Sequence, residues 1–220
     1  MHGKGSLDAS AQCERGAATY DRFDGPLERL AFRRWRERLW AQVRGQRILE
    51  VGVGTGRNMP FYPPGSDVTA IDQSANMLGC ARWRADALGL HVDLRVMDAQ
   101  KLEFADQNFD AAVATLVFCS VPDPVAGLRE LGRVLRTAGR IYLLEHMRAD
   151  KEWQGRVMDG LDWFLARFSA ERVARRTLDN VRAAGLQIER VENVMRGGVV
   201  KLIVAKASQG PPAARRRPLC

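Results

Sequence analysis

The stretch with the clearest chemical potential is RILEVGVGTGRN, residues 47–58. Its first half is an apolar, partly β-branched run of the kind that fills a strand buried on both faces. Three glycines follow at alternate positions, Gly52, Gly54 and Gly56. Glycine permits left-handed turns and close approach of a ligand, because no Cβ stands in the way. The spacing therefore predicts a strand that ends in a ligand-binding loop.

The residues around this loop indicate which ligand it binds. A dinucleotide fingerprint, G-x-G-x-x-G, needs its third glycine at position 57, where this chain has Arg57. Glu50 stands before the loop, where its charge repels a pyrophosphate and attracts the α-ammonium group of an amino-acid moiety. Both features favour S-adenosylmethionine over NAD. An NAD-linked oxidoreductase is the alternative from another class, and the absence of a Tyr-x-x-x-Lys pair argues against it.

Two acidic residues follow the next two apolar runs. Asp72 comes sixteen residues after Gly56, at the end of a second strand, where a carboxylate can accept hydrogen bonds from both ribose hydroxyls. Asp98 closes a third strand and could accept from the exocyclic amine of adenine, with an ordinary turn aspartate as the alternative. Met77, on the helix between them, could touch adenine or belong to the core. These residues and the glycine loop predict a nucleoside site.

Polar side chains also follow the fourth and fifth apolar runs, where we expect the second substrate. Thr115 lies in the second half of the fourth strand and reaches the same edge, and Cys119 and Ser120 line the place where a cleft should open. His146 follows the fifth strand and is the candidate general base, although a histidine bonded to a backbone carbonyl explains it as well. Cys119 is expected to be a wall residue, because no His-Asp set accompanies it as a nucleophile would require. No metal is expected, because the histidines are dispersed and lack clustered carboxylates.

Composition limits the class of protein. With 220 residues, 46% hydrophobic and 27% charged, the chain fits one domain, and no apolar run approaches the roughly 18 residues of a membrane span. The first residues, MHGKGSLDAS, lack the apolar centre of a signal peptide, so we expect a cytoplasmic protein. The four cysteines are scattered, which predicts reduced thiols.

The net charge of +8 suits an anionic partner, such as a lipid headgroup surface or an acidic substrate, and a coding bias toward arginine explains it equally. A nucleic-acid methyltransferase is a third hypothesis, suggested by net charge alone. It is not favoured, because the chain has no N-P-P-Y motif and its three Tyr and five Trp do not form a base-stacking array.

Residues 26–43, PLERLAFRRWRERLWAQV, form a basic amphipathic pattern of helical period. Such a helix covers its own core more often than it lies on a membrane, so we expect a lid. Phe32 and Trp40 are expected to be exposed. With the flanking arginines they leave open a peripheral position on an anionic membrane, at its inner face.

Strand and helix patterns alternate through five rounds, which predicts a parallel sheet with right-handed crossovers. Strands are expected at residues 48–51, 68–71, 91–97, 108–118, 140–144, 186–194 and 199–205, and helices at 26–43, 75–88, 124–135, 151–168 and 171–184. The predicted fold is α/β, a doubly wound, seven-stranded, mostly parallel sheet in the order 3-2-1-4-5-7-6, with strand 7 antiparallel and helices on both faces. Ligands should bind at the carboxyl edge beside strand 1, where the strand order reverses.

With these segments in place, the chain resembles the class I S-adenosylmethionine-dependent methyltransferases over roughly residues 18–206. The resemblance is carried by EVGVGTGRN, TAIDQSANML, MDAQKLEF, FDAAVATLVFCSVPDP and LRELGRVLRTAGRIYLLEH. FCSVPD and LLEH resemble the methyltransferase-11 type, which includes bacterial phosphatidylethanolamine N-methyltransferases, quinone-biosynthesis C-methyltransferases and animal thiol methyltransferases. Thr137-Ala138-Gly139 departs from the usual Arg/Lys-Pro-Gly-Gly turn, and the longer C-terminal signature of the quinone enzymes is not obvious.

The resemblance implies S-adenosylmethionine as methyl donor, S-adenosylhomocysteine as product, and a small apolar or lipid-like acceptor such as a phospholipid amine. A quinone carbon or a thiol is the alternative acceptor. The expected cofactor residues are Glu50, Gly52, Gly54, Gly56, Asp72, Gln73, Met77, Asp98, Ala99 and Thr115. The expected acceptor pocket contains Tyr20, Cys119, Ser120 and His146.

The resemblance also sets the expected domain limits. One methyltransferase domain covers residues 17–206, between a flexible segment 1–16 and a basic, flexible tail 207–220. Within it, the lid helix at 26–43 and an acceptor cap at about 147–184 are expected to enclose the second substrate.

Overall fold

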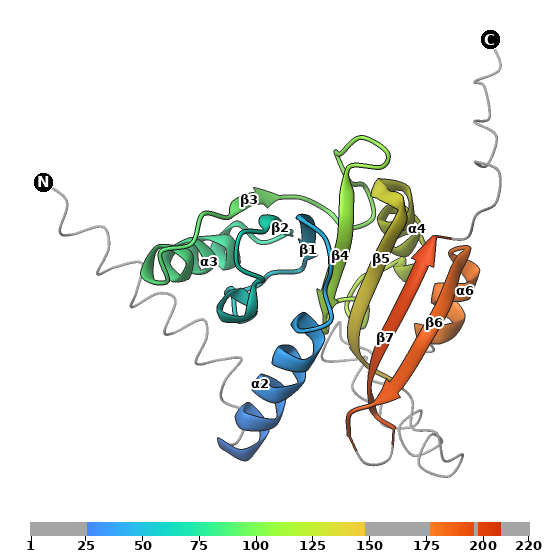
Figure 1. Ribbon diagram of the computed structural model, residues 1–220, viewed down its shortest axis with the longest axis horizontal. Helices are drawn as coiled ribbons and strands as arrows, with labels where there is room; N and C mark the ends of the chain where they lie inside the picture. The colour runs from blue at the N-terminus through green and yellow to red at the C-terminus, as the bar shows by residue number, and fades with distance from the viewer. Residues whose placement is uncertain (1–25, 148–176, 196–197, 208–220) are drawn as a thin grey trace, which may run out of the picture.

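A mixed sheet of seven strands forms the centre of the molecule (Figure 1). The computed structural model describes residues 26–147, 177–195 and 198–207. The strands are β1 (Arg47–Val51), β2 (Asp67–Asp72), β3 (Asp93–Val96), β4 (Phe109–Thr115), β5 (Leu135–His146), β6 (Leu186–Asn193) and β7 (Val200–Ala207). Their order is β3-β2-β1-β4-β5-β7-β6, and β7 runs antiparallel to both of its neighbours. The predicted order and strand directions are confirmed.

Helices cover both faces of this sheet. They are α2 (Pro26–Trp40), the 3₁₀ helix η1 (Met59–Phe61), α3 (Ala75–Ala87), α4 (Pro124–Val134) and α6 (Thr177–Ala183). Side chains of α2 and α3 pack on one face, and side chains of α4 and α6 pack on the other. Ser74 and Asp123 cap α3 and α4 by accepting from backbone N–H groups of the first turn.

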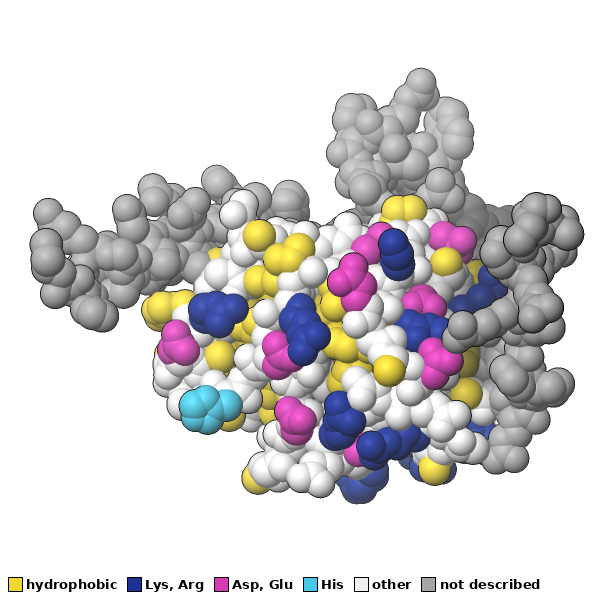
Figure 2. All heavy atoms as spheres, turned by 90° about the horizontal axis from the view of Figure 1, so that it is seen from above, with side chains coloured by type: hydrophobic (Ala, Val, Ile, Leu, Met, Phe, Trp, Pro, Cys, Tyr) yellow, Lys and Arg dark blue, Asp and Glu magenta, His cyan; other side chains and the backbone are white. Residues whose placement is uncertain are grey.

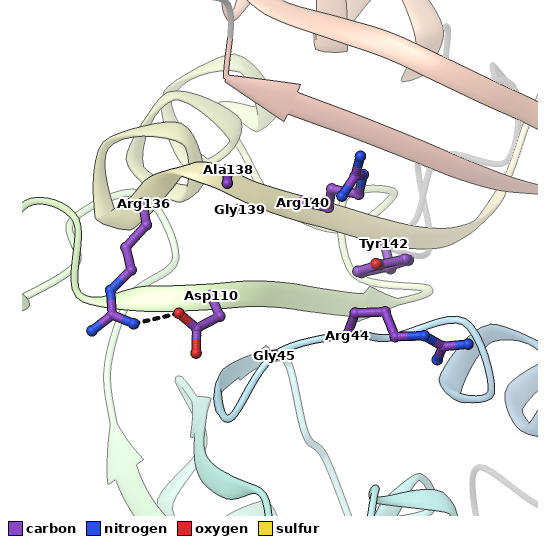
Figure 3. A pocket seen from close by; sticks show the side chains of 8 residues that line it. All are labelled: Arg44, Gly45, Asp110, Arg136, Ala138, Gly139, Arg140 and Tyr142. Atoms are coloured by element: carbon purple, nitrogen blue, oxygen red, sulfur yellow. Dashed lines mark hydrogen bonds and ion pairs between the residues drawn. The ribbon is translucent and has the colours of Figure 1, made fainter.

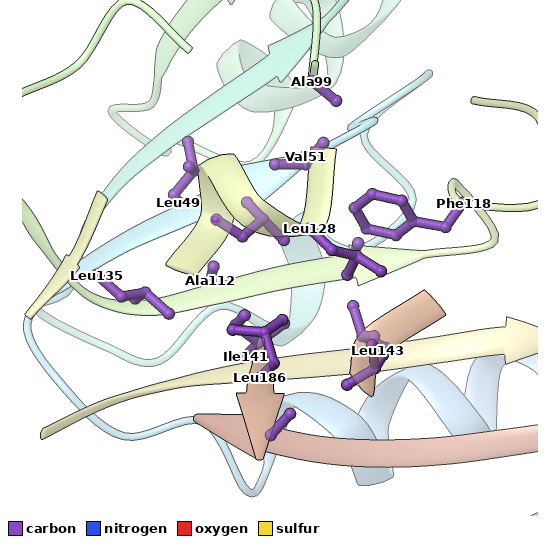
Figure 4. Close-up of a cluster of buried hydrophobic side chains, with 14 of the residues drawn as sticks. Leu49, Val51, Ala99, Ala112, Phe118, Leu128, Leu135, Ile141, Leu143 and Leu186 are labelled. Carbon is purple, nitrogen blue, oxygen red and sulfur yellow. The ribbon is translucent and has the colours of Figure 1, made fainter. Parts of the chain in front are cut away.

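Successive residues of the central strands face opposite layers, as the period of a strand requires. In β4, Ala112 belongs to the core under α4, whereas Val113 belongs to the core under α2. Figure 4 shows the first of these cores, where Leu128 of α4 lies among strand side chains that include Leu49 and Ile141. Burial on both faces explains why these strands are near-continuous apolar runs in the sequence.

Away from the limits of the described ranges, three element boundaries differ from the expected ones by three residues or more. β4 ends at Thr115 rather than at residue 118, because Leu116 turns the chain with a left-handed φ of +57°. β5 begins at Leu135, directly after α4, and residues 136–139 bulge out where its register against β4 shifts. α2 ends at Trp40 rather than at residue 43, where N–H groups bond three residues back and tighten the last turn.

The aromatic side chains of α2 face the sheet. Phe32 and Trp40 are only 9% and 1% exposed, so the expectation that they are exposed is wrong. The ring of Trp35 lies 4.9 Å from that of Phe32, and the ring of Trp40 lies 4.7 Å from that of Tyr62. The apolar face of α2 is therefore wider than its aliphatic residues alone indicated. Phe32 and Trp40 lie on this face because of their positions in the helical period.

The expectation of reduced thiols is wrong for Cys80, which is disulfide-bonded, whereas the buried Cys119 forms no disulfide. Within the described ranges, no helix combines the length and hydrophobicity that crossing a bilayer requires. Several expected segments lie outside the described residues. They are segment 1–16, the helix at 151–168, the part of the expected cap (147–184) that spans residues 148–176, and all but the first residue of the tail 207–220.

Candidate functional site

The glycine loop lies at the carboxyl end of β1 and is held by its own backbone and by Asp72. The N–H of Gly52 donates to the carbonyl of Ile71 at 2.8 Å. Gly54 has a φ of +54°, and its N–H donates to Oδ2 of Asp72 at 2.9 Å. The N–H of Ser74 donates to Oδ1 of the same carboxylate at 2.9 Å. Asp72 therefore joins the glycine loop to the start of α3.

One side of the loop is open. Among the described residues, a Cβ added to Gly54 would meet no atom within 4 Å, so a ligand can approach the backbone there. A Cβ on Gly52 would instead lie 2.4 Å from Cγ2 of Val117, so this glycine is needed for packing. Each oxygen of Asp72 keeps a second lone-pair direction that can accept a ribose hydroxyl. These features fit the nucleoside and amino-acid parts of S-adenosylmethionine, and the individual contacts stay predictions.

Glu50 lies beneath the loop and is fully buried. Nδ2 of Asn58 donates to its Oε1 at 2.6 Å, and the hydroxyl of Tyr62 donates to its Oε2. Burial raises the pKa of Glu50 because the charged form loses its hydration, and these two hydrogen bonds oppose part of the rise. Burial also holds the pKa of Tyr62 well above its ordinary value, which keeps its hydroxyl a donor. Both oxygens of Glu50 are engaged within the protein, so its contact with a ligand ammonium stays a prediction.

Asn58 connects Glu50 to two further elements. Its Nδ2 also donates to Oγ1 of Thr115 at 3.1 Å, at the end of β4. Its Oδ1 accepts from Nη1 of Arg36, on α2, at 2.8 Å. One side-chain amide therefore links α2, the segment after the glycine loop and the end of β4. Sequence reasoning missed Asn58, Tyr62 and Arg36, and the only available signal was that Asn58 closes the glycine-loop stretch.

The residues predicted near adenine lie at neighbouring strand ends. The N–H of Met97 donates to the carbonyl of Asp72 at 3.0 Å, which places the ends of β2 and β3 side by side. Asp98 follows directly and is exposed, and its Oδ1 accepts from the backbone and the side chain of Gln100 at 2.8 and 3.0 Å. Gln73 is exposed, Met77 is half-buried and Ala99 is buried. Their contacts with adenine stay predictions.

The residues predicted for the acceptor follow β4 and β5. Cys119 is buried, and Ser120 is exposed with its hydroxyl bonded to a carbonyl of the preceding turn at 2.8 Å. His146 is half-buried, and Phe32 of α2 packs edge-to-face against it with ring centres 6.0 Å apart. A side chain of α2 therefore packs against His146, and both the role of α2 as a lid and the role of His146 as a base stay predictions. Tyr20 lies outside the described residues.

Glu145 is a further residue that sequence reasoning missed. It is fully buried, and its Oε1 accepts two backbone N–H groups of the turn after β4. The available signal was an acidic residue at the end of an otherwise apolar strand, LLEH. The part of the chain that the structure describes contains no group of three or more His, Cys, Asp or Glu side chains able to hold a metal, and metal-independent transfer stays a prediction.

A cavity of about 270 Å³ lies at the opposite edge of the sheet, near the start of β4 and the bulge of β5 (Figure 3). Its charged side chains bind within the protein, since Asp110 pairs with Arg136 and Arg140 pairs with Glu189. Figure 2, which views this edge, shows Lys and Arg side chains interspersed with Asp and Glu rather than one patch of positive charge. Because this cavity lies at the start of β4 and Cys119 follows the end of β4, the cavity is separate from the cleft predicted beside Cys119.

Comparison with known proteins assigns the chain to a class. Residues 49–143 match a family model described as a methyltransferase domain. The chain is 39% identical over 147 residues to a phosphatidylethanolamine N-methyltransferase of Cereibacter sphaeroides, an alignment that covers 66% of this chain and 71% of that protein. It is 42% identical over 106 residues to the human thiol S-methyltransferase TMT1A, covering 47% of this chain and 43% of that protein. It is 32% identical over 142 residues to a demethylmenaquinone methyltransferase of Renibacterium salmoninarum, covering 63% and 58%.

The fold agrees with the sequence relatives. A crystal structure of a SAM-dependent methyltransferase from Aquifex aeolicus superposes with a TM-score of 0.61 at 20% identity, covering 86% of this chain and 96% of that one. At that identity the likeness concerns the fold alone. The identity to the Cereibacter enzyme supplies the class, and the sheet order and open glycine loop agree with it. The chain belongs to the methyltransferase-domain family of S-adenosylmethionine-dependent methyltransferases.

Proposed function

We propose that this enzyme transfers the methyl group to the amine of a phospholipid headgroup. The proposal rests on how much of each relative's length aligns with this chain. The chain spans 71% of the relative named phosphatidylethanolamine N-methyltransferase, but only 43% of the thiol and 58% of the demethylmenaquinone methyltransferase. The identity to the first relative is also higher over a similar aligned length, 39% over 147 residues against 32% over 142 residues for the demethylmenaquinone methyltransferase.

The site residues suit an amine acceptor. The donor supplies a methyl carbon that its sulfonium already activates, so the protein needs mainly to align the acceptor. A primary ammonium has a pKa of about 10 in water and no lone pair to attack with until it loses a proton. His146, half-buried beneath α2 at the end of β5, is the candidate to take that proton. The glycine loop and Asp72 would hold the donor beside it.

The outer side of α2 supports contact with a membrane that carries such a substrate. Arg33 and Arg34 are exposed, whereas Phe32 packs against His146 on the inner side. Each arginine near an anionic surface contributes about 1 kcal/mol. The contact should therefore be weak and reversible, and it should be electrostatic because the aromatic residues face the sheet.

The acceptor is tested with a donor whose transferred methyl is labelled. Vesicles of phosphatidylethanolamine and phosphatidylglycerol are compared with vesicles in which phosphatidylcholine replaces the phosphatidylethanolamine. We expect label only in the first set, in a lipid heavier by one methyl group on mass spectrometry. An alkyl thiol and a demethylmenaquinone are offered in parallel reactions. Label in either of these, with none in phosphatidylethanolamine, would overturn the proposed acceptor.

The role of His146 is tested by the pH dependence of His146→Asn. We expect kcat to fall roughly 10²-fold or more at neutral pH, as loss of a general base does. The deficit should shrink as pH rises toward the pKa of the amine, because the acceptor then loses its proton to solvent. A deficit that stays constant over the whole range would show that His146 serves packing against Phe32 instead.

A further inference from the structure

The turn that follows β4 carries an unusual backbone conformation at the edge where the ligands are expected. Leu116 has a φ of +57°, a left-handed value that a residue with a branched side chain adopts only when its surroundings enforce it. Its N–H donates to the carbonyl of Leu144 at 2.8 Å, which secures only the first residue of the turn. Something else must hold the residues that follow.

Glu145 holds them. It comes from the next strand, is fully buried, and its Oε1 accepts from the N–H of Val117 at 2.9 Å and the N–H of Phe118 at 3.0 Å. Hydrogen bonds from N–H groups to a carboxylate are stronger than those to a neutral acceptor. Lys201, 7% exposed, lies directly opposite Glu145 in the antiparallel register of β5 and β7, so their side chains share one face of the sheet.

The turn contacts both halves of the expected site. On the donor side, Val117 packs so closely on Gly52 of the glycine loop that a Cβ there would lie 2.4 Å from its Cγ2. On the acceptor side, the carbonyls of the turn accept from Sγ of Cys119 at 3.5 Å and from Oγ of Ser120 at 2.8 Å. Phe118 anchors the turn from below in the core under α4 (Figure 4). A displacement of this turn would therefore move the glycine loop relative to Cys119 and Ser120, the residues expected to line the acceptor pocket.

We propose that Glu145 is a positioning residue for methyl transfer. By binding two consecutive N–H groups, its carboxylate holds Leu116 in the left-handed conformation and so sets the spacing between the glycine loop and the residues at Cys119 and Ser120. Glu145 acts from the α4 side of the sheet and is not assigned contact with either substrate. The inference rests on methyl transfer by this family and is independent of which acceptor is used.

The matched pair of variants is Glu145→Gln and Asp110→Asn. Asp110 lies on β4 at the opposite edge of the sheet, and its carboxylate also accepts two backbone N–H groups, at 3.0 and 2.9 Å. Both substitutions replace a charged acceptor by a neutral one. We expect Glu145→Gln to lower kcat by roughly 10- to 100-fold, as a small misplacement of reacting groups does, with KM for the donor nearly unchanged. Asp110→Asn should lose stability without that loss of kcat.

A rescue separates positioning from a general loss of stability. Glycine adopts a φ of +57° without strain, so adding Leu116→Gly to Glu145→Gln should recover part of the lost kcat, whereas adding it to Asp110→Asn should recover none. Amide hydrogen exchange of Val117 and Phe118 gives a readout that needs no acceptor, and it should speed up in Glu145→Gln only. Equal kcat losses in the two single variants, no rescue, or unchanged exchange at these amides would each overturn the proposal. A failure of the phospholipid acceptor would leave all three readouts measurable with whichever acceptor is turned over.

Discussion

The carboxylate of Asp72 supports the fold and is also predicted to bind the ligand. Its two oxygens accept from the glycine loop and from the start of α3. They hold the loop in the shape that leaves the Cβ side of Gly54 open. Because each oxygen can accept a second hydrogen bond, binding of ribose would add contacts without breaking those present.

Replacing Asp72 by alanine should weaken binding of S-adenosylmethionine by about 1–3 kcal/mol, roughly 5- to 150-fold, because ribose hydroxyls and two backbone N–H groups lose an acceptor. Isothermal titration calorimetry measures this directly. Asp67→Ala, at the exposed start of the same strand, is the control and should bind normally. Unchanged affinity of the Asp72 variant would place the ribose elsewhere.

Two glutamates should respond to pH in opposite directions. Burial raises the pKa of Glu50, so its contribution to stability is present below the ordinary pKa of about 4.5 and is lost as pH rises through the raised value. A hydrogen bond from Arg133 lowers the pKa of Glu130, so its contribution is present above the ordinary pKa and is lost as pH falls. Relative to the wild type, Glu50→Gln should gain stability from acid to neutral pH, and Glu130→Gln should lose it. Urea unfolding of both variants over this range measures the two slopes, and slopes of the same sign would contradict the assignment.

At the scale of elements, α2 does more than cover the core. Its aromatic residues pack on the sheet and on His146, and Arg36 reaches the amide of Asn58 behind the glycine loop. The helix expected to cover the acceptor therefore also contacts the network that supports the donor loop. We therefore expect the position of α2 to affect the binding of the donor.

Arg36→Ala tests this coupling. Loss of its hydrogen bond to Asn58 should cost about 0.5–1.5 kcal/mol, the value of a partly exposed hydrogen bond, and should weaken donor binding several-fold. Arg33→Ala removes the same charge from an exposed position of the helix and should leave donor affinity unchanged. If calorimetry finds both variants equal to the wild type, the lid and the donor loop are independent.

At the scale of the whole molecule, the charge of +8 and the exposed arginines of α2 predict salt-sensitive binding to anionic vesicles. Co-sedimentation should rise with the fraction of phosphatidylglycerol and disappear near 1 M salt, where the Debye length is about 3 Å. Reversing Arg33 and Arg34 to glutamate should abolish it. Reversing Arg82 and Arg190, which are exposed on other elements, makes the same change in net charge and should only weaken it. Equal effects of the two double variants would assign the binding to net charge rather than to α2.

Local patterns in the sequence were sufficient for the architecture. Alternating strand and helix patterns gave the order of the first five strands, because right-handed crossovers allow few arrangements of such a chain. The last two strands were predicted from a hairpin pattern, and β7 is antiparallel to both of its neighbours. The sequence also predicted the glycine loop, where Gly54 has a left-handed conformation, and the cap at Ser74. Both depend only on the conformation of neighbouring residues in the chain. The boundary at Thr115 was not, because the turn at Leu116 depends on Glu145 almost thirty residues later.

The sequence by itself therefore determined the fold, the position of the glycine loop and the class of chemistry. Only the tertiary structure decided what surrounds them. Tyr62 on Glu50, Arg36 on Asn58 and Glu145 beneath the turn after β4 are contacts between elements distant in the chain. The same holds for Phe32 and Trp40, whose burial depends on where the sheet lies beneath α2. A buried polar side chain is stabilised by whichever partner the packing brings to it, and no periodicity or spacing in the sequence encodes that partner.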